Sequence, residues 1–208
     1  MIRTWMPWAL ALGALLGSFD SSAQRYDAAA ACGGLTDATS IQDVGVTALQ
    51  ARVQQGRCTL HVVAVDADAL ARQQRMLEAV SMAACKAAVE PQPSAQPLSL
   101  ELRLPARCPL SSKTTLFPAA SGNWKPGIPE YPATAVRDGL QGKVRLRALV
   151  NENGRVVAAV VRVSSGHAVL DTAAAKGVRS WTMQRDVQQP ALPAMSVMEV
   201  PVTFALNE

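Results

Sequence analysis

Cysteines are the residues of this 208-residue chain with the clearest capacity for chemistry, because each can form a disulfide bond or bind a metal ion. All four lie in the first half of the chain: Cys32, Cys58, Cys85 and Cys108. An even number of cysteines in an exported protein favours two disulfide bonds. Zinc is the alternative, but no CxxC pair occurs and neither His61 nor His167 lies at ligand spacing from a cysteine. We expect two disulfides and no metal site.

A catalytic site would need polar side chains that converge, and the sequence offers two weak candidates. Ser165 lies near His167, but neighbouring side chains diverge as they leave a strand, so this stretch is better explained as a strand-to-helix junction. Asp66 and Asp68 fit a helix N-terminus, where carboxylates complement free backbone donors. The G-x-S-x-G, H-E-x-x-H, phosphate-loop and dinucleotide motifs do not occur. We therefore expect no enzyme and no cofactor.

The composition indicates an ordinary globular protein without a nucleic-acid footprint. The chain is 49% hydrophobic and 17% charged, which is enough apolar material for one mid-sized core or two small ones. Its net charge is only +4, and the basic residues occur singly instead of in runs that would follow phosphates. We expect protein partners and no nucleic acid.

The first residues indicate export. Arg3 precedes an apolar run from Trp5 to Phe19, which is followed by Ser21, Ser22, Ala23 and Gln24. This pattern is typical of a secretory signal peptide, so we expect residues 1–23 to be cleaved and the mature protein to be periplasmic. An uncleaved anchor in the inner membrane, with the rest of the chain facing the periplasm, is the alternative. The run is shorter than the roughly 20 apolar residues that a spanning helix needs.

The hydrophobic pattern divides the exported chain into two α+β domains, residues 24–110 and 126–208, joined by a polar linker at 111–125. In the second domain, alternating residues predict a hairpin over 142–150 and 156–164, with a turn at 151–154. Helical spacing follows over 168–181, and alternation returns over 198–206. One or two helical turns precede the hairpin at 131–139. The element order is helix, strand, strand, helix, strand.

The first domain has a similar order of elements. Residues 46–53 and 58–66 predict a hairpin, 67–88 a helix and 98–104 an alternating strand. We interpret this order as a divergent, disulfide-bonded copy of the second domain's β-β-α-β plan; a chance similarity of two small domains is the alternative. If the copy is real, Cys58 and Cys85 lie at one end of the layer and Cys108 at the other. That arrangement favours a Cys58–Cys85 bond and a Cys32–Cys108 bond.

The second domain resembles the TonB C-terminal domain. The residues that carry the resemblance are Tyr131-Pro132, Ala135, Gly139, Gly142-Lys143-Val144, Asn153-Gly154, Ser164-Ser165-Gly166, Leu170-Asp171, Ala174, Trp181 and Val200-Pro201-Val202-Thr203-Phe204. The resemblance implies two helices on one face of a three-stranded antiparallel sheet. Several of these residue types have structural explanations, such as the turn glycines and the large apolar Trp181.

The resemblance also implies a function. In the family, the domain binds an extended segment of an outer-membrane transporter by adding a strand to its sheet edge, beside the last strand. Here that strand is 198–206, and its alternating residues on one face are Met198, Val200, Val202 and Phe204. The alternative is that the first domain or a second copy of the chain covers this edge.

Three departures from the family plan shape the functional prediction. TonB energy transducers carry a membrane-spanning helix that engages the ExbB–ExbD motor and a long proline-rich spacer, whereas this sequence shows a short leader, no such spacer and an additional cysteine-bearing domain. We therefore expect a periplasmic peptide-binding module. The alternatives are a membrane-anchored energy transducer, and a structural envelope protein that uses the domain to form a homodimer.

Overall fold

The computed structural model describes residues 41–54, 57–105, 123–125, 127–184 and 195–206. Its elements are β1 (Val46–Gln54), β2 (Arg57–Ala64), α2 (Ala67–Cys85), β3 (Glu90–Gln92), β4 (Ser99–Arg103), β5 (Asn123–Lys125), α3 (Ala133–Arg137), β6 (Gly142–Asn151), β7 (Val156–Val163), α4 (Ala168–Val178), β8 (Thr182–Gln184) and β9 (Met195–Phe204). The predicted signal peptide at 1–23 lies outside these residues. Within the described ranges, no helix is long and apolar enough to cross a membrane.

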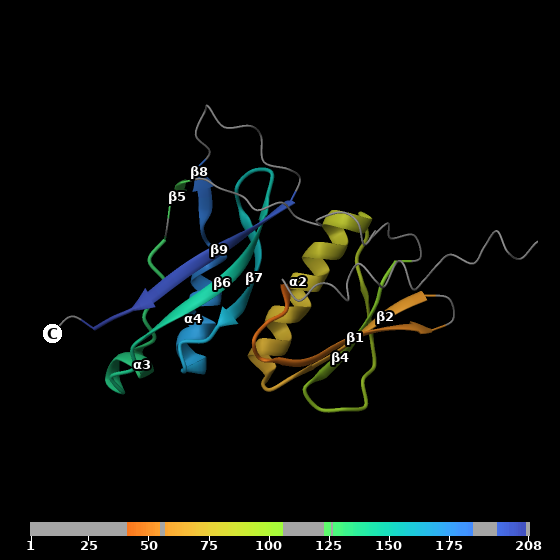
Figure 1. Cartoon of the computed structure of the whole chain (residues 1–208), viewed down its shortest axis with the longest axis horizontal. Helices are drawn as coiled ribbons and strands as arrows, with labels where there is room; N and C mark the ends of the chain where they lie inside the picture. The colour runs from red at the N-terminus through yellow and green to blue at the C-terminus, as the bar shows by residue number, and fades with distance from the viewer. Residues whose placement is uncertain (1–40, 55–56, 106–122, 126, 185–194, 207–208) are drawn as a thin grey trace, which may run out of the picture.

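The N-terminal half is an antiparallel sheet with α2 packed on it. β1 and β2 form the predicted hairpin, and the sheet continues in the order β1-β2-β4-β3 (Figure 1). Leu60, Val62 and Ala64 alternate into the core, as the period of two in the sequence indicates. α2 begins where Asp66 accepts a hydrogen bond from the backbone of Ala69 at 2.6 Å. Asp66 is therefore a helix cap, as expected.

The proline-rich segment after α2 changes the topology of this half. The helix ends at Cys85 instead of Ala88, and β3 pairs antiparallel with β4. Because β3 reverses the chain direction once more, β4 enters the sheet antiparallel to β2. In the C-terminal half the last strand, β9, instead pairs with the first strand of its hairpin, β6. The two halves share an order of elements but not an order of strands, and the predicted copy of one plan is not confirmed.

The same topology removes the argument for the predicted disulfide pairing. The backbone N–H of Leu104 donates to the carbonyl of Cys58 at 2.8 Å, so the strand preceding Cys108 ends beside the start of β2. The predicted pairing requires the last strand of this half to run parallel to β2, so that Cys58 and Cys108 lie at opposite ends of the sheet. β4 runs antiparallel to β2 instead. Neither Cys58 nor Cys85 is a free thiol. Cys32 and Cys108 lie outside the described residues, so the pairing stays a prediction.

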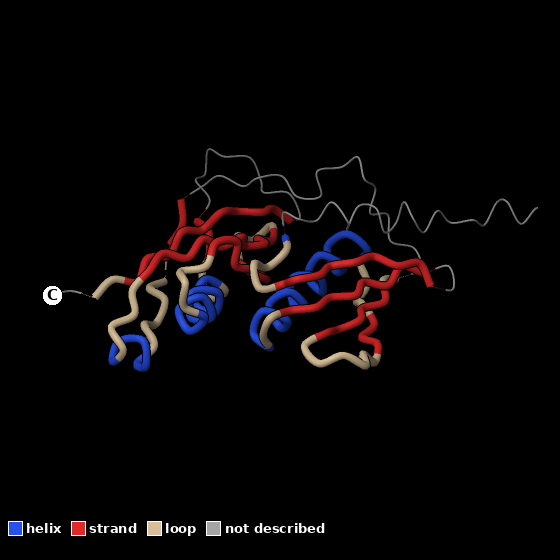
Figure 2. Tube along the Cα trace, turned by 60° about the horizontal axis from the view of Figure 1, so that its bottom comes forward, coloured by secondary structure: helices blue, strands red, loops and turns tan. Residues whose placement is uncertain are grey.

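The C-terminal half contains a three-stranded antiparallel sheet in the order β7-β6-β9, with α3 and α4 on one face (Figure 2). The β6–β7 turn is held by Asn151, whose side-chain oxygen accepts from the backbone of Asn153 and of Arg155. Trp181 is buried in the core against this sheet, as expected for the largest apolar side chain of the region. The coarse prediction of an antiparallel α+β domain is confirmed.

Besides β3, two further short strands were not predicted. β5 pairs with β8 in a separate two-stranded sheet, with Trp124 opposite Met183. The last three residues of the predicted linker therefore belong to a strand, and the helix expected to reach Trp181 ends at Val178. Each strand has only three residues, which is too short for alternation to be recognised. Residues 106–122 of the linker region lie outside the described chain.

The two halves share a hydrophobic core. α2 packs against β7 on one side and against the N-terminal sheet on the other, so it lies between the two sheets in Figure 1. Leu149, Ala158 and Val160 of the C-terminal sheet belong to the same apolar cluster as Leu60 and Met76 of the N-terminal half. The halves are thus packed as one body along β7.

A buried ion pair fixes this junction. The carboxylate of Asp43 accepts from Arg72 of α2 at 2.8 and 3.0 Å, and their side chains are only 0% and 8% exposed. The same carboxylate accepts from the backbone of Gly45 at 3.0 Å and of Val161 in β7 at 2.8 Å. Burial lowers the pKa of Arg72, but the hydrogen bond and charge of Asp43, with Asp66 and Asp68, outweigh it, so the pKa is raised.

Replacing Asp43→Asn should strongly destabilise the protein, because it leaves the Arg72 guanidinium buried without a counter-charge. Breaking a buried pair by removing one partner costs about 3–5 kcal/mol. Urea unfolding of the purified protein measures the loss. The matched control is Asp138→Asn, whose pair with Arg137 is exposed and should be worth less than about 1 kcal/mol. Equal losses in the two variants would contradict this account of the junction.

Candidate functional site

The two edges of the C-terminal sheet differ in what lies beside them. β7 forms one edge, and there Val44 donates its backbone N–H to the carbonyl of Val161 at 2.7 Å. Arg162 of β7 donates to the carbonyl of Gln42 at 2.8 Å, and α2 packs against the same strand. β9 forms the other edge, and among the described residues it pairs with β6 alone. Within the described chain, the N-terminal half therefore covers β7 and not β9.

The residues predicted to bind a partner lie on β9, but their side chains face the core. Met198, Val200, Val202 and Phe204 are only 5%, 2%, 4% and 4% exposed and pack in the cluster beneath α4. Phe204 also meets Tyr131 edge to face, with ring centroids 5.2 Å apart. These side chains hold β9 in the domain, so a partner at this edge would meet the strand's backbone.

Proline shows which backbone groups of β9 point outward. β9 pairs with β6 in continuous register from Met195 to Phe204, and Pro201 lies opposite Arg145. A proline nitrogen has no hydrogen, so in a sheet it occupies positions whose nitrogen faces away from the neighbouring strand. Because the N–H and C=O of one residue point to the same side and alternate along a strand, Val197, Glu199 and Thr203 also point outward. Met195, at the start of β9, follows the same alternation, so the outer edge has four donors and lacks one at Pro201.

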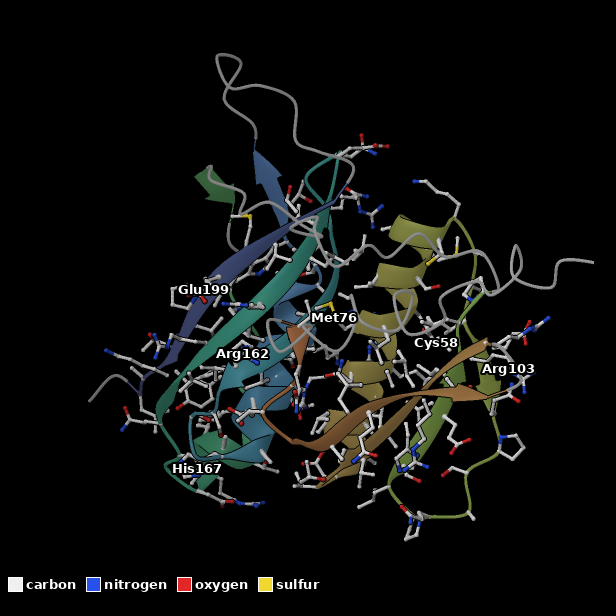
Figure 3. The ribbon with its side chains drawn as sticks, turned by 45° about the vertical axis from the view of Figure 1, so that its right-hand side comes forward. Cys58, Met76, Arg103, Arg162, His167 and Glu199 are labelled. Atoms are coloured by element: carbon white, nitrogen blue, oxygen red, sulfur yellow. The ribbon has the colours of Figure 1, made fainter. Side chains whose placement is uncertain are left out.

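A row of basic side chains lies on β6, the strand next to β9. These side chains are on the face of the sheet opposite α3 and α4. Lys143, Arg145 and Arg147 alternate along β6 opposite Thr203, Pro201 and Glu199 of β9. Arg147 pairs with Glu199 at 3.1 Å, and Glu199 lies on β9 in Figure 3. Lys143 and Arg145 are exposed, and no described acidic residue forms an ion pair with either. Neighbouring strands are ~4.8 Å apart, so this positive charge lies within reach of a strand added beside β9.

The serine and histidine noted in the sequence do not form a catalytic pair. Ser165 donates its hydroxyl to Asp171 at 2.8 Å and contacts the backbone of His167, which precedes α4 and is labelled in Figure 3. Asp171 also accepts from the backbone of Ser165 at 2.9 Å and from the hydroxyl of Ser164. The expected strand-to-helix junction is confirmed, with the buried Asp171 carboxylate as its centre.

Sequence reasoning treated Asp171 only as part of a motif and missed this role. The available signal was its position in the first turn of α4, where a carboxylate is favoured by the helix dipole and by free donors from the preceding loop. Among the described residues, no group of three or more histidine, cysteine, aspartate or glutamate side chains could hold a metal ion.

Comparisons with known proteins relate the C-terminal half of the chain to one family. Residues 128–206 match the family model described as "Gram-negative bacterial TonB protein C-terminal". The chain is similar to Protein tonB2 of Pseudomonas aeruginosa, with 35% identity over 121 residues, which are 58% of this chain and 44% of that protein. It is also similar to Protein TonB of Xanthomonas campestris pv. campestris, with 40% identity over 88 residues, 42% of this chain and 38% of that protein. The chain thus spans less than half the length of these relatives. No solved structure matches it significantly.

Replacing Asp171→Ala should destabilise the C-terminal half, because the backbone N–H of Ser165 and two serine hydroxyls lose a charged acceptor. Hydrogen bonds to charged groups contribute about 1.5–3 kcal/mol, so we expect a loss of about 2 kcal/mol in urea unfolding. Ser165→Ala, which removes one of the three donors and leaves the carboxylate in place, should cost less. A loss below about 0.5 kcal/mol for the Asp171 variant would show that the junction does not depend on this side chain.

Proposed function

Since residues 128–206 of the chain belong to the TonB C-terminal family, we propose that this protein binds an extended peptide segment along the outer edge of β9. The peptide would add a fourth strand to the sheet β7-β6-β9 by backbone hydrogen bonds. By the family resemblance, the partner is a periplasmic segment of an outer-membrane transporter. We propose the periplasm as the place where the two meet.

The observation that carries this proposal is the difference between the two sheet edges. An edge strand presents unpaired N–H and C=O groups, which proteins usually cover or block. Here β7 is covered by residues 42–44 and α2, whereas β9 has only β6 beside it in the described chain. Pro201 is the one residue of β9 that cannot donate a backbone hydrogen bond to an added strand. The edge can still bind a strand, and the missing donor disfavours unspecific pairing.

The charges near this edge indicate which peptides would bind best. A peptide strand beside β9 directs alternate side chains to the face that carries Lys143 and Arg145. The added strand would lie two strand spacings, roughly 9.6 Å, from β6, so these long side chains would attract acidic groups and repel basic ones across β9. We therefore propose that the preferred partner carries acidic residues at alternate positions on this face. Coupling to an energy source in the inner membrane is a property of the whole transducer and forms no part of this proposal.

Replacing Thr203→Pro removes one outward donor and should weaken peptide binding about fivefold, which is the effect of losing one net hydrogen bond. The partner is selected from a peptide array tiling the outer-membrane transporters of Pseudomonas aeruginosa, and its affinity is measured by calorimetry. Thr203→Val retains the N–H and should bind like the parent protein.

Pro201→Thr restores the missing donor and gives a second, opposite test. It should bind the same peptide more tightly, by up to about fivefold. Thermal unfolding of each variant confirms that the sheet is intact. The proposal fails if Thr203→Pro and Thr203→Val bind equally well, because pairing along the outer edge requires them to differ.

A further inference from the structure

A basic cleft is lined by α2 of the N-terminal half and α4 of the C-terminal half. The two helices are labelled in Figure 1. Its volume is about 230 Å³, and β7 contributes to its floor. Two alanines form the apolar part of the lining, and the remaining side chains are polar or charged. The polar lining comes from both helices: Asp68, Arg72 and Arg75 of α2, Thr172 and Lys176 of α4, and Arg179, the C-cap residue of α4.

Three of the four cations in the cleft are not paired with an acidic residue. Arg72 is neutralised by Asp43. Arg75, Lys176 and Arg179 form no ion pair with any acidic residue in the part of the chain that the structure describes. These three positive charges and the single carboxylate of Asp68 leave a charge of 3 − 1 = +2 in the cleft.

The like charges of the cleft repel one another. Burial lowers the pKa of Arg75, and the like charges of Arg179 and Arg72 lower it further. The carboxylates of Glu78 and Asp68 offset part of this effect, and Asp68 also accepts from the Thr172 hydroxyl at 3.0 Å. Arg72 reaches the same hydroxyl at 3.4 Å. The polar groups of the two helices thus converge around an unbalanced positive charge.

We propose that this cleft binds a phosphate group carrying two negative charges, held between Arg75 of α2 and, on the other side, Lys176 of α4 and the C-cap residue Arg179. Guanidinium groups bind phosphate oxygens with paired hydrogen bonds, and lysine adds a point charge. The size of the cleft agrees, since about 230 Å³ is below the roughly 300–1,000 Å³ of sites for drug-sized ligands and suits a small anion with some water.

Such a ligand would bridge the two halves of the protein, because its cations come from both. The site is independent of peptide binding, since it lies at β7 and α4 and is not lined by β9. Free phosphate and the terminal phosphate of a lipid headgroup present the same chemistry. The exposure of Lys176 and Arg179 leaves the cleft accessible to both sources.

Calorimetry with inorganic phosphate, at constant ionic strength and neutral pH, tests the proposal on the full exported chain. We expect saturable binding that Arg75→Gln and Arg179→Gln each weaken at least about tenfold, because each removes charge-assisted hydrogen bonds. Arg155→Gln, at an exposed arginine beside the β6–β7 turn and outside the cleft, is the control and should leave binding unchanged. Lys176→Gln provides a third variant at an exposed position, should either arginine variant fold poorly.

Flotation with vesicles of phosphatidic acid in phosphatidylcholine identifies the source of the phosphate. If the protein binds these vesicles but not free phosphate, and the cleft variants lose vesicle binding, the proposal is supported with a lipid as the ligand. Absence of saturable binding to both probes would overturn it. Equal weakening by Arg155→Gln would overturn it as well, because it would show attraction to net charge instead of a site.

Discussion

The Asp43 carboxylate is the interaction on which the arrangement of this protein depends. It is completely buried, and it accepts hydrogen bonds from α2, from the loop before β1 and from β7. A buried carboxylate is tolerable only when its oxygens are fully satisfied and its charge is paired. Those conditions are met only when the N-terminal half lies against β7, so the network specifies where the halves join as well as contributing to stability.

This junction determines which edge of the C-terminal sheet remains for function. Residues 42–44 and α2 occupy the β7 side, and the apolar cluster continues through Leu149, Ala158 and Val160. β9 is left at the other edge, held by a complete register with β6 and by side chains buried under α4. Among the described residues β9 pairs with β6 alone, and a rigid edge of this kind suits strand addition, because little order has to be gained by the protein on binding. The N-terminal half thus contributes to the proposed function by covering the competing edge.

The sequence predicted the longer elements well because their periodicity is strong. The hairpin β6–β7, the helix α4 and the strand β9 each carry enough alternating or helical residues to be recognised. β3, β5 and β8 have three residues each and carry no such signal. The strand order of the N-terminal half was missed for a related reason. The unrecognised β3 reverses the direction of the chain, so that β4 runs antiparallel to β2 and pairs with it. The sequence predicts a binding edge on β9, and that site stays a prediction. The four side chains named for it are buried, which alternation alone does not reveal, because it predicts which side chains share a face without showing which face is buried.

Hydrogen exchange of single backbone amides in β9 tests the central claim most directly. The account predicts that a bound transporter peptide protects the outward amides of Val197, Glu199 and Thr203, while those of Met198, Val200 and Val202, already bonded to β6, exchange slowly with and without it. Protection of the outward amides alone would establish strand addition at β9. Peptide binding that leaves these three amides unprotected would contradict the account and move the binding site elsewhere on the protein.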